Sequence, residues 1–153
     1  MKIGVISDTH GFLDPRIPDL FKGVDHILHA GDIGYASVIL ELEFIAPVTA
    51  VLGNNDTGLD FPELGRVKLG EFQFQIEHIV PPMKPAPDVA ERLRRTGTAA
   101  LVFGHSHRRY CATHDGVLFF NPGYAGKPKL GLLRSAAIIE FENGTLRPKF
   151  LDL

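Results

Sequence analysis

The chain has 153 residues, of which 44% are hydrophobic, and a formal net charge of −2. This length predicts one domain, which would bury about 70% of the surface that its unfolded chain exposes. The small net charge supplies no general field for attracting long nucleic acid or anionic membrane, so an anionic substrate must be held by local charge. The single cysteine, Cys111, excludes a disulfide within the chain, and we expect its side chain to be buried as a small hydrophobe.

The sequence also bears on location. It shows no basic and apolar leader at its N-terminus, and no apolar run approaches the length of about 18 residues that a membrane helix needs. We therefore expect a cytoplasmic protein without a membrane segment. Whether it forms a homo-oligomer stays open.

The first half of the chain predicts alternating strands and helices. Apolar runs stopped by turn residues predict buried strands over 3–6, 24–30 and 48–52. Apolar residues at helical spacing follow Pro15 in a short segment and extend from Tyr35 to Ile45 in a longer one. Right-handed crossovers would place the carboxyl ends of three parallel strands at one edge of a sheet.

The second half predicts hairpins, one buried strand and one helix. Each predicted hairpin has a turn sequence between two strands: 66–69 with 72–77, 110–114 with 117–120, and 136–141 with 146–151. A helix is predicted over 88–96 and a buried strand over 99–103. The proline-rich stretch 81–87 predicts a loop, because proline suits neither a helix interior nor a central strand.

Side chains that can bind metal follow the ends of five predicted strands: Asp8 with His10, Asp32, Asn54, His78, and His105 with His107. One such residue alone is equally typical of a turn or a helix N-cap, but five separate junctions are hard to obtain by chance. Nitrogen and oxygen donors without a thiolate favour Mn²⁺, Fe, Ni²⁺ or Zn²⁺ at an open catalytic site. Seven groups suffice for two ions that share one carboxylate. By contrast, His26 and His29 lie within a predicted strand, and we expect both to be structural.

The order of the motifs carries a resemblance to a known family. Asp8-x-His10, Gly31-Asp32, Gly53-Asn54-Asn55-Asp56, His78 and Gly104-His105-Ser106-His107 span nearly the whole chain. In this the chain resembles the calcineurin-like metallophosphoesterase superfamily, and its short length is similar to the small prokaryotic phosphodiesterase branch. The resemblance implies an α/β fold, an αββα four-layer sandwich of two mixed β-sheets flanked by helices, formed as a single domain over residues 1–153.

The resemblance also implies a metal-dependent phosphoric ester hydrolase, most simply a phosphodiesterase acting on a small phosphate ester. It implies two divalent transition-metal ions, with Mn²⁺ as the first expectation and a hydroxide between them that attacks phosphorus in line. By position, Asp8, His10 and His107 would bind one ion. Asn54, His78 and His105 would bind the other, and Asp32 would bridge the two. The residues expected to act in catalysis are Asp32, Asn54, Asn55 and His105.

Some residues depart from the family pattern. Members with general-acid chemistry have His where this chain has Asn55, and an amide has no titratable proton to give a leaving alkoxide. Ile79 stands where Gly usually follows the metal-binding His, and Tyr124 stands where a small Ser usually follows the Asn-Pro-Gly loop. Arg108 and Arg109 could contact a substrate phosphate, or they could be solvated charges that open a hairpin.

Two other functions are compatible with the resemblance. The superfamily includes a trafficking-complex scaffold that keeps the fold and loses metal ligands, so an interaction scaffold, with or without metal, is one alternative. Here every ligand position is filled, which favours the enzyme. A nuclease or nucleotide phosphatase is the other alternative. The near-neutral charge disfavours long nucleic acid, but it does not disfavour cyclic or short nucleotides.

Overall fold

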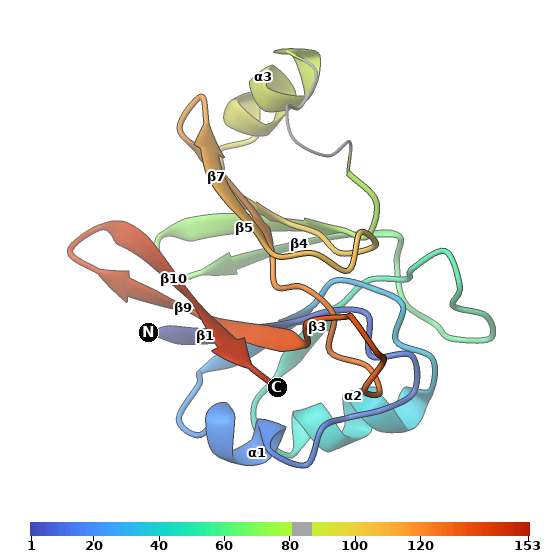
Figure 1. Ribbon diagram of the computed structural model, residues 1–153. Helices are drawn as coiled ribbons and strands as arrows, with labels where there is room; N and C mark the ends of the chain where they lie inside the picture. The colour runs from blue at the N-terminus through green and yellow to red at the C-terminus, as the bar shows by residue number, and fades with distance from the viewer. Residues whose placement is uncertain (81–86) are drawn as a thin grey trace.

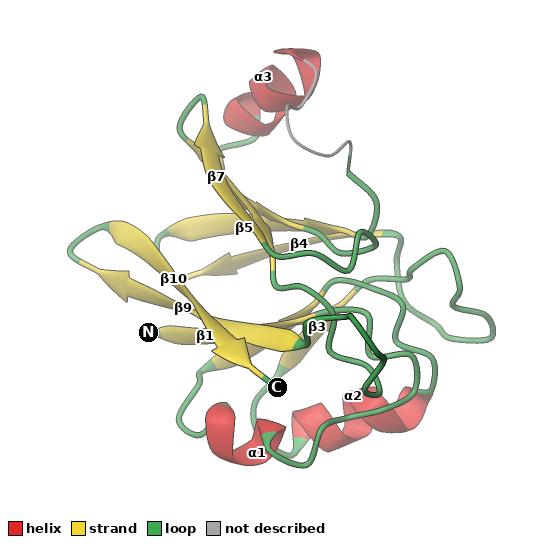
Figure 2. Ribbon diagram, in the orientation of Figure 1, coloured by secondary structure: helices red, strands yellow, loops and turns green. Residues whose placement is uncertain are grey.

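In the computed structural model, which describes residues 1–80 and 87–153, the chain forms two five-stranded sheets (Figures 1 and 2). The first sheet contains β1 (Lys2–Ile6), β2 (His26–His29), β3 (Val48–Ala50), β9 (Ser135–Glu142) and β10 (Thr145–Asp152). The second contains β4 (Leu64–Leu69), β5 (Phe72–Glu77), β6 (Thr98–Val102), β7 (Tyr110–His114) and β8 (Val117–Asn121). Their strand orders are β10-β9-β1-β2-β3 and β4-β5-β6-β8-β7.

Both sheets are mixed. In the first, β1, β2 and β3 are parallel, with Val5 opposite Leu28, and β9 is antiparallel to β1. In the second, β6 is parallel to both β5 and β8, while β4 and β7 form antiparallel hairpins with their neighbours. The carboxyl ends of β1, β2 and β3 therefore lie at one edge of the first sheet, as the sequence predicts.

Three helices cover the outer faces of the sheets: α1 (Ile17–Leu20), α2 (Ala36–Glu43) and α3 (Pro87–Arg95). Figure 1 shows α1 and α2 below the first sheet and α3 on the far side of the second. Pro18 in the first turn accompanies a helix α1 of only four residues. The predicted αββα arrangement is confirmed, with a single helix in the fourth layer of the described chain.

Three apolar clusters hold these layers together. The cluster between the sheets joins Val5 and Leu28 of the first sheet to Phe74 and Phe120 of the second. A second cluster packs the helices α1 and α2 against the outer face of the first sheet. A third surrounds Leu93 of α3, which is fully buried against the second sheet. The alternating and continuous apolar runs of the sequence supply the faces that these clusters bury.

Two expectations need comment. Cys111 is exposed, so the prediction that it is buried is wrong. It lies on β7, an edge strand whose alternate side chains face solvent, and sequence alone does not mark a strand as an edge. The predicted loop 81–87 falls mostly on residues 81–86, which lie outside the described residues, whereas Pro87 begins α3. Across the described residues, every helix is too short or too polar to cross a membrane.

Candidate metal centre

The predicted ligands lie on loops that follow β1, β2, β3, β5 and β6, and backbone hydrogen bonds tie these loops together. The amide of Asp8 donates to the carbonyl of Gly31 (3.0 Å), and the amide of His10 donates to the carbonyl of Asp32 (2.9 Å). From the second sheet, the amide of Gly104 donates to the carbonyl of His78 (3.0 Å). The backbone amide of His105 donates to Asp8 Oδ2 (3.2 Å), so the loops of the two sheets are also joined to each other.

Four of the predicted ligands form one compact group. Asp8, His10, Asp32 and His107 each offer one atom, and these atoms lie within 4.8 Å of one another. His107 Nε2 lies 3.3 Å from Asp8 Oδ1, His10 Nε2 lies 3.7 Å from Asp32 Oδ2, and the two imidazole nitrogens are 3.4 Å apart. Two nitrogen and two oxygen donors thus converge at the spacing that a bound cation requires.

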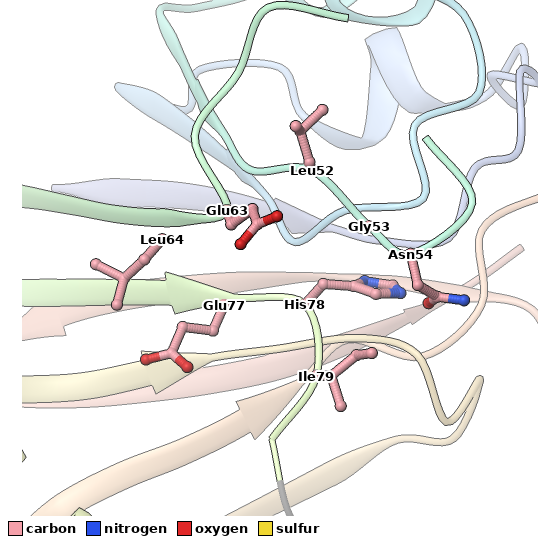
Figure 3. Close-up of a pocket in the computed structure, with 8 residues that line it drawn as sticks. All are labelled: Leu52, Gly53, Asn54, Glu63, Leu64, Glu77, His78 and Ile79. Carbon is pink, nitrogen blue, oxygen red and sulfur yellow. The ribbon is translucent and has the colours of Figure 1, made fainter. Parts of the chain in front are cut away.

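The other three predicted ligands lie next to this group, since His78 Nε2 is within 4.0 Å of carboxylate oxygens of both Asp8 and Asp32. His78 Nε2 is 3.4 Å from Asp32 Oδ2, and the rings of His78 and His105 meet edge to face at 5.3 Å between centroids. His105 Nδ1 lies 2.9 Å from the Asn54 amide oxygen. Figure 3 shows the His78 ring extending toward the side on which Asn54 lies. Asp32 Oδ2 therefore lies close to an imidazole nitrogen of each set, 3.7 Å from His10 Nε2 and 3.4 Å from His78 Nε2.

Two buried polar atoms at this site have no hydrogen-bond partner among the described residues: Asp8 Oδ1 and His78 Nε2. His78 Nδ1 lies 2.7 Å from the Ala30 carbonyl, so it carries the proton and leaves the Nε2 lone pair free. The other Asp8 oxygen accepts hydrogen bonds from Ser7 Oγ (2.7 Å) and the amide of His105 (3.2 Å). A buried acceptor without a partner costs about 1–3 kcal/mol, and bound divalent cations would satisfy both atoms. The residues present therefore fit metal ions.

The backbone at the site is strained. Five of the seven predicted ligands adopt positive φ: Asp8 (55°), His10 (48°), Asp32 (51°), His105 (67°) and His107 (57°). Within residues 1–80 and 87–153, the only other residues besides glycine in this conformation belong to hairpin turns, Asp115 and Asn143. Left-handed backbone costs a non-glycine residue about 1–2 kcal/mol, and such strain clusters at functional sites.

Neighbouring groups hold Asp32 in place. The backbone amide of Asn55 donates to Asp32 Oδ1 (3.0 Å), and its side-chain amide donates to Asp32 Oδ2 (2.7 Å). Burial by itself would raise the pKa of the Asp32 carboxyl, but the hydrogen bonds from Asn55 and the nearby His78 and His10 together lower it. Asp56 accepts hydrogen bonds from three backbone amides, those of Ile33, Gly34 and Gly53, and so fixes the adjoining loops. Asp32 is thereby kept ionised and oriented.

The His29 side chain connects the loop that contains Thr9 to the loop that contains Gly31. Its Nδ1 accepts from the amide of Gly31 (3.2 Å), so its Nε2 donates to Thr9 Oγ1 (3.0 Å), which in turn donates to the Ile33 carbonyl (2.9 Å). Complete burial lowers the pKa of His29 to about 4. His26 Nε2 lies 2.8 Å from Thr49 Oγ1. The structure thus places both of these imidazoles outside the group of candidate ligands.

Several contacts at the site were not predicted from the sequence. Tyr124 is fully buried, its ring lies 4.8 Å from that of His107, and Lys129 Nζ lies 5.4 Å from the Tyr124 centroid. The pKa of His107 is raised against the effect of burial, because its protonated ring can donate to the Asp8 carboxylate and is stabilised by the charge of that carboxylate. Ser7 Oγ donates to Asp8 Oδ2 and so positions this carboxylate. The sequence pointed to this role only in that Ser7 is a polar residue directly after an apolar strand.

The two arginines after the last predicted ligand have different surroundings. Arg109 forms an ion pair with Asp152 of β10, and its guanidinium lies 5.2 Å from the Phe150 ring centroid. Arg108 is exposed, and its backbone amide donates to Ser106 Oγ (3.4 Å). Of the two roles considered for Arg109, these contacts favour a structural one at the start of the hairpin.

A four-layer α/β sandwich with nitrogen and oxygen donors gathered at its strand ends is the architecture of a metalloprotein. The sequence model of the calcineurin-like phosphoesterase superfamily domain matches residues 1–144, and the chain belongs to this family. The family implies divalent metal ions, in agreement with the group formed by Asp8, His10, Asp32 and His107.

Known proteins extend this assignment. A protein of Methanothermobacter thermautotrophicus named as a probable metallophosphoesterase is 34% identical over 142 residues, which are 85% of this chain and 80% of the relative. A phosphodiesterase of Methanocaldococcus jannaschii is 31% identical, with 87% of this chain and 92% of the relative covered. The crystal structure of a Vps29 single mutant from Entamoeba histolytica superposes with a TM-score of 0.78 at 21% identity, over 100% of this chain and 99% of that one, which shows the shared fold.

Proposed function

We propose that this protein is a phosphodiesterase that holds two divalent metal ions and hydrolyses small phosphate esters. The observation that carries the proposal is the position of Asp32, whose Oδ2 faces His10 at 3.7 Å and His78 at 3.4 Å. One carboxylate between two sets of donors is the arrangement that a shared ligand needs. The similarity to a phosphodiesterase supports the same reaction.

The residues divide into two sets around Asp32. Asp8, His10 and His107 would hold one ion, and Asn54, His78 and His105 would hold the other. When bound, the ions supply Lewis acidity toward the phosphoryl oxygens and lower the pKa of a water molecule. The buried carboxylates of Asp8 and Asp32 supply negative charge at a fixed position. Oxygen and nitrogen donors of this kind favour Mn²⁺ or another transition metal at a catalytic site over a structural zinc ion.

Asn55 is proposed to act through Asp32. Its side-chain NH₂ donates to Asp32 Oδ2, so it orients the bridging carboxylate. An amide has no titratable proton, so this position cannot act as a general acid. We therefore propose that activated esters, whose leaving groups depart as stable anions, are cleaved better than alkyl esters.

The test is a hydrolysis screen of the metal-depleted protein with Mn²⁺, Fe²⁺, Ni²⁺ or Zn²⁺ added back. Bis(4-nitrophenyl) phosphate, 4-nitrophenyl phosphate and cyclic nucleotides are the substrates. We expect metal-dependent hydrolysis of the diester, abolished by Asp32→Ala and kept by Asp60→Ala, a matched change of an exposed aspartate. Turnover by Asp32→Ala above a tenth of wild type would contradict the bridging role.

A protein-binding scaffold is the second candidate, favoured by the fold similarity to Vps29. Leu130 and Leu133, in the segment before β9, are exposed and would suit a protein partner. A scaffold of this kind needs no bound metal. Absence of transition metal after mild purification, together with no hydrolysis in the screen, would favour it over the enzyme.

A further inference from the structure

A cavity of about 430 Å³ opens beside the metal centre, on the side of the second predicted ion. Two predicted ligands, Asn54 and His78, form part of its wall. The remainder of the wall comes from residues that the proposed chemistry does not use, among them Glu63, Glu77, Leu64 and Ile79 (Figure 3). A group attached to a phosphate at the metal centre would enter this cavity.

The charge of the cavity is negative. Glu63 is exposed and has no hydrogen-bond or ion-pair partner among the described residues, so its full charge is available. Glu77 accepts a hydrogen bond from the Gln75 side chain at Oε1, which leaves its second oxygen free. No lysine or arginine lines the described wall of the cavity. Figure 3 shows the two carboxylates on one side of the His78 ring and the Asn54 amide on the other.

The cavity also has apolar surface. Leu52, Leu64 and Ile79 contribute to its lining, and Leu64 and Ile79 are exposed hydrophobic residues, at 38% and 53%. A cavity that is lined by both apolar side chains and carboxylates suits a group that is positively charged and rich in methyl or methylene carbon. Ammonium groups on short alcohols have this character, whereas a further phosphate or carboxylate would be repelled.

We propose that this cavity receives the alcohol of the phosphodiester that is not expelled, and that it selects alcohols carrying a positive charge, such as amino alcohols. The proposal rests on the proposed function, because the phosphate of the same substrate must lie at the metal centre. In the reaction, water adds to phosphorus, the bond to the expelled alcohol breaks, that alcohol leaves as an anion or takes a proton that the water gives up, and the phosphomonoester that carries the ammonium group is released.

A matched pair of substrates tests the proposal. In 4-nitrophenyl phosphorylcholine the retained alcohol carries a quaternary ammonium, and in 4-nitrophenyl 3,3-dimethylbutyl phosphate a neutral carbon replaces its nitrogen. The two have the same shape and the same leaving group. An exposed ion pair supplies a factor of about 1.4 to 5, so two carboxylates should give the substrate with the ammonium group a kcat/KM about two to thirty times higher.

The variants identify the residues responsible. We expect the ratio of the two kcat/KM values to fall toward one in the double variant Glu63→Gln, Glu77→Gln. Glu63→Gln alone should lower it about twofold or more, and this exposed side chain has no partner whose loss could disturb folding. Glu71→Gln, an exposed change in the turn between β4 and β5, should keep the wild-type ratio.

A binding measurement separates this proposal from the proposed function. Phosphorylcholine and 3,3-dimethylbutyl phosphate are titrated into Zn²⁺-loaded protein and followed by NMR, which requires no turnover. Tighter binding of phosphorylcholine, lost on Glu63→Gln, supports the cavity assignment even if no ester is hydrolysed. Equal binding and equal rates overturn it, and if both diesters are hydrolysed the proposed phosphodiesterase function still stands.

Discussion

Replacement of His29 by glutamine tests whether the ligand loops depend on a buried, neutral imidazole. His29 is fully buried and joins the loop of Thr9 to the loop of Gly31 by side-chain hydrogen bonds. Its pKa is lowered to about 4 because burial disfavours the charged form. In the unfolded chain the same imidazole titrates near 6.5. Between pH 4 and pH 6.5, His29 is therefore mostly protonated in the unfolded chain and mostly neutral in the folded one.

The size of the effect follows from the two pKa values. The contribution of His29 to stability is complete above pH 6.5 and is lost as the pH falls toward 4, since its folded pKa is depressed. Proton linkage with these values gives a loss of about 2 kcal/mol in the free energy of unfolding between pH 7 and pH 5. His29→Gln removes this part of the pH dependence. It also lowers stability at pH 7 by about 1–3 kcal/mol, because at least one buried partner is left unpaired.

Urea unfolding of the chelator-treated protein at pH 7 and pH 5 measures these differences. His26→Gln is the matched control, because His26 lies on the same strand, is only partly buried and contacts Thr49 rather than a ligand loop. We expect the control to keep most of the wild-type pH dependence and, when metal is added back, to bind as much of it as the wild type. A pH dependence in His29→Gln equal to that of the wild type would refute the assignment of a buried neutral imidazole.

Three further predictions address other parts of the site and the fold. Gly104→Ala should weaken metal binding tenfold or more in a titration, because a Cβ there would lie 2.0 Å from Ser7 Oγ, which positions Asp8. The hydrolysis rate of the wild type is expected to depend steeply on the pKa of the leaving group, and Asn55→His should flatten this dependence, since a positioned acid is worth about 10²–10⁴ in rate. An unchanged slope across a series of aryl and alkyl esters would show that another group supplies the proton. Asp14→Asn should cost about 2–3 kcal/mol in unfolding at pH 7, because Asp14 is buried and ion-paired with Arg134. Hydrogen bonding from Arg16 holds the pKa of Asp14 well below its usual range, so the difference between variant and wild type should shrink as the pH falls below about 3.9.

The strand-end residues of the first sheet were predictable because their signals are local. An apolar run followed by Asp8, Asp32 or Asn54 marks a buried strand and its end, and parallel pairing then brings the three ends to one edge. The same logic predicted both later hairpins of the second half. The helices α1 to α3 and the strands β4, β5 and β6 also fall within a few residues of their expected positions.

Contacts between distant segments could not be predicted in this way. The bond from Asn55 to Asp32 joins residues 23 positions apart, and only the tertiary structure shows that the Asn55 amide faces a carboxylate. The exposure of Cys111 depends on the order of strands in the sheet. The cavity that contains Glu63 and Glu77 is lined by the loop after β3, the start of β4 and the end of β5, and no local sequence pattern predicts that these segments lie around one cavity.

The most direct test of the central claim is a titration of metal-depleted protein with Mn²⁺, with bound metal and bis(4-nitrophenyl) phosphate hydrolysis measured together. The proposal predicts that activity rises until about two ions are bound per chain. It also predicts that Asp32→Ala lowers the affinity for both ions, and that His78→Ala lowers it for one more than for the other. Full activity with a single bound ion, or no transition-metal binding at all, would contradict the two-metal site.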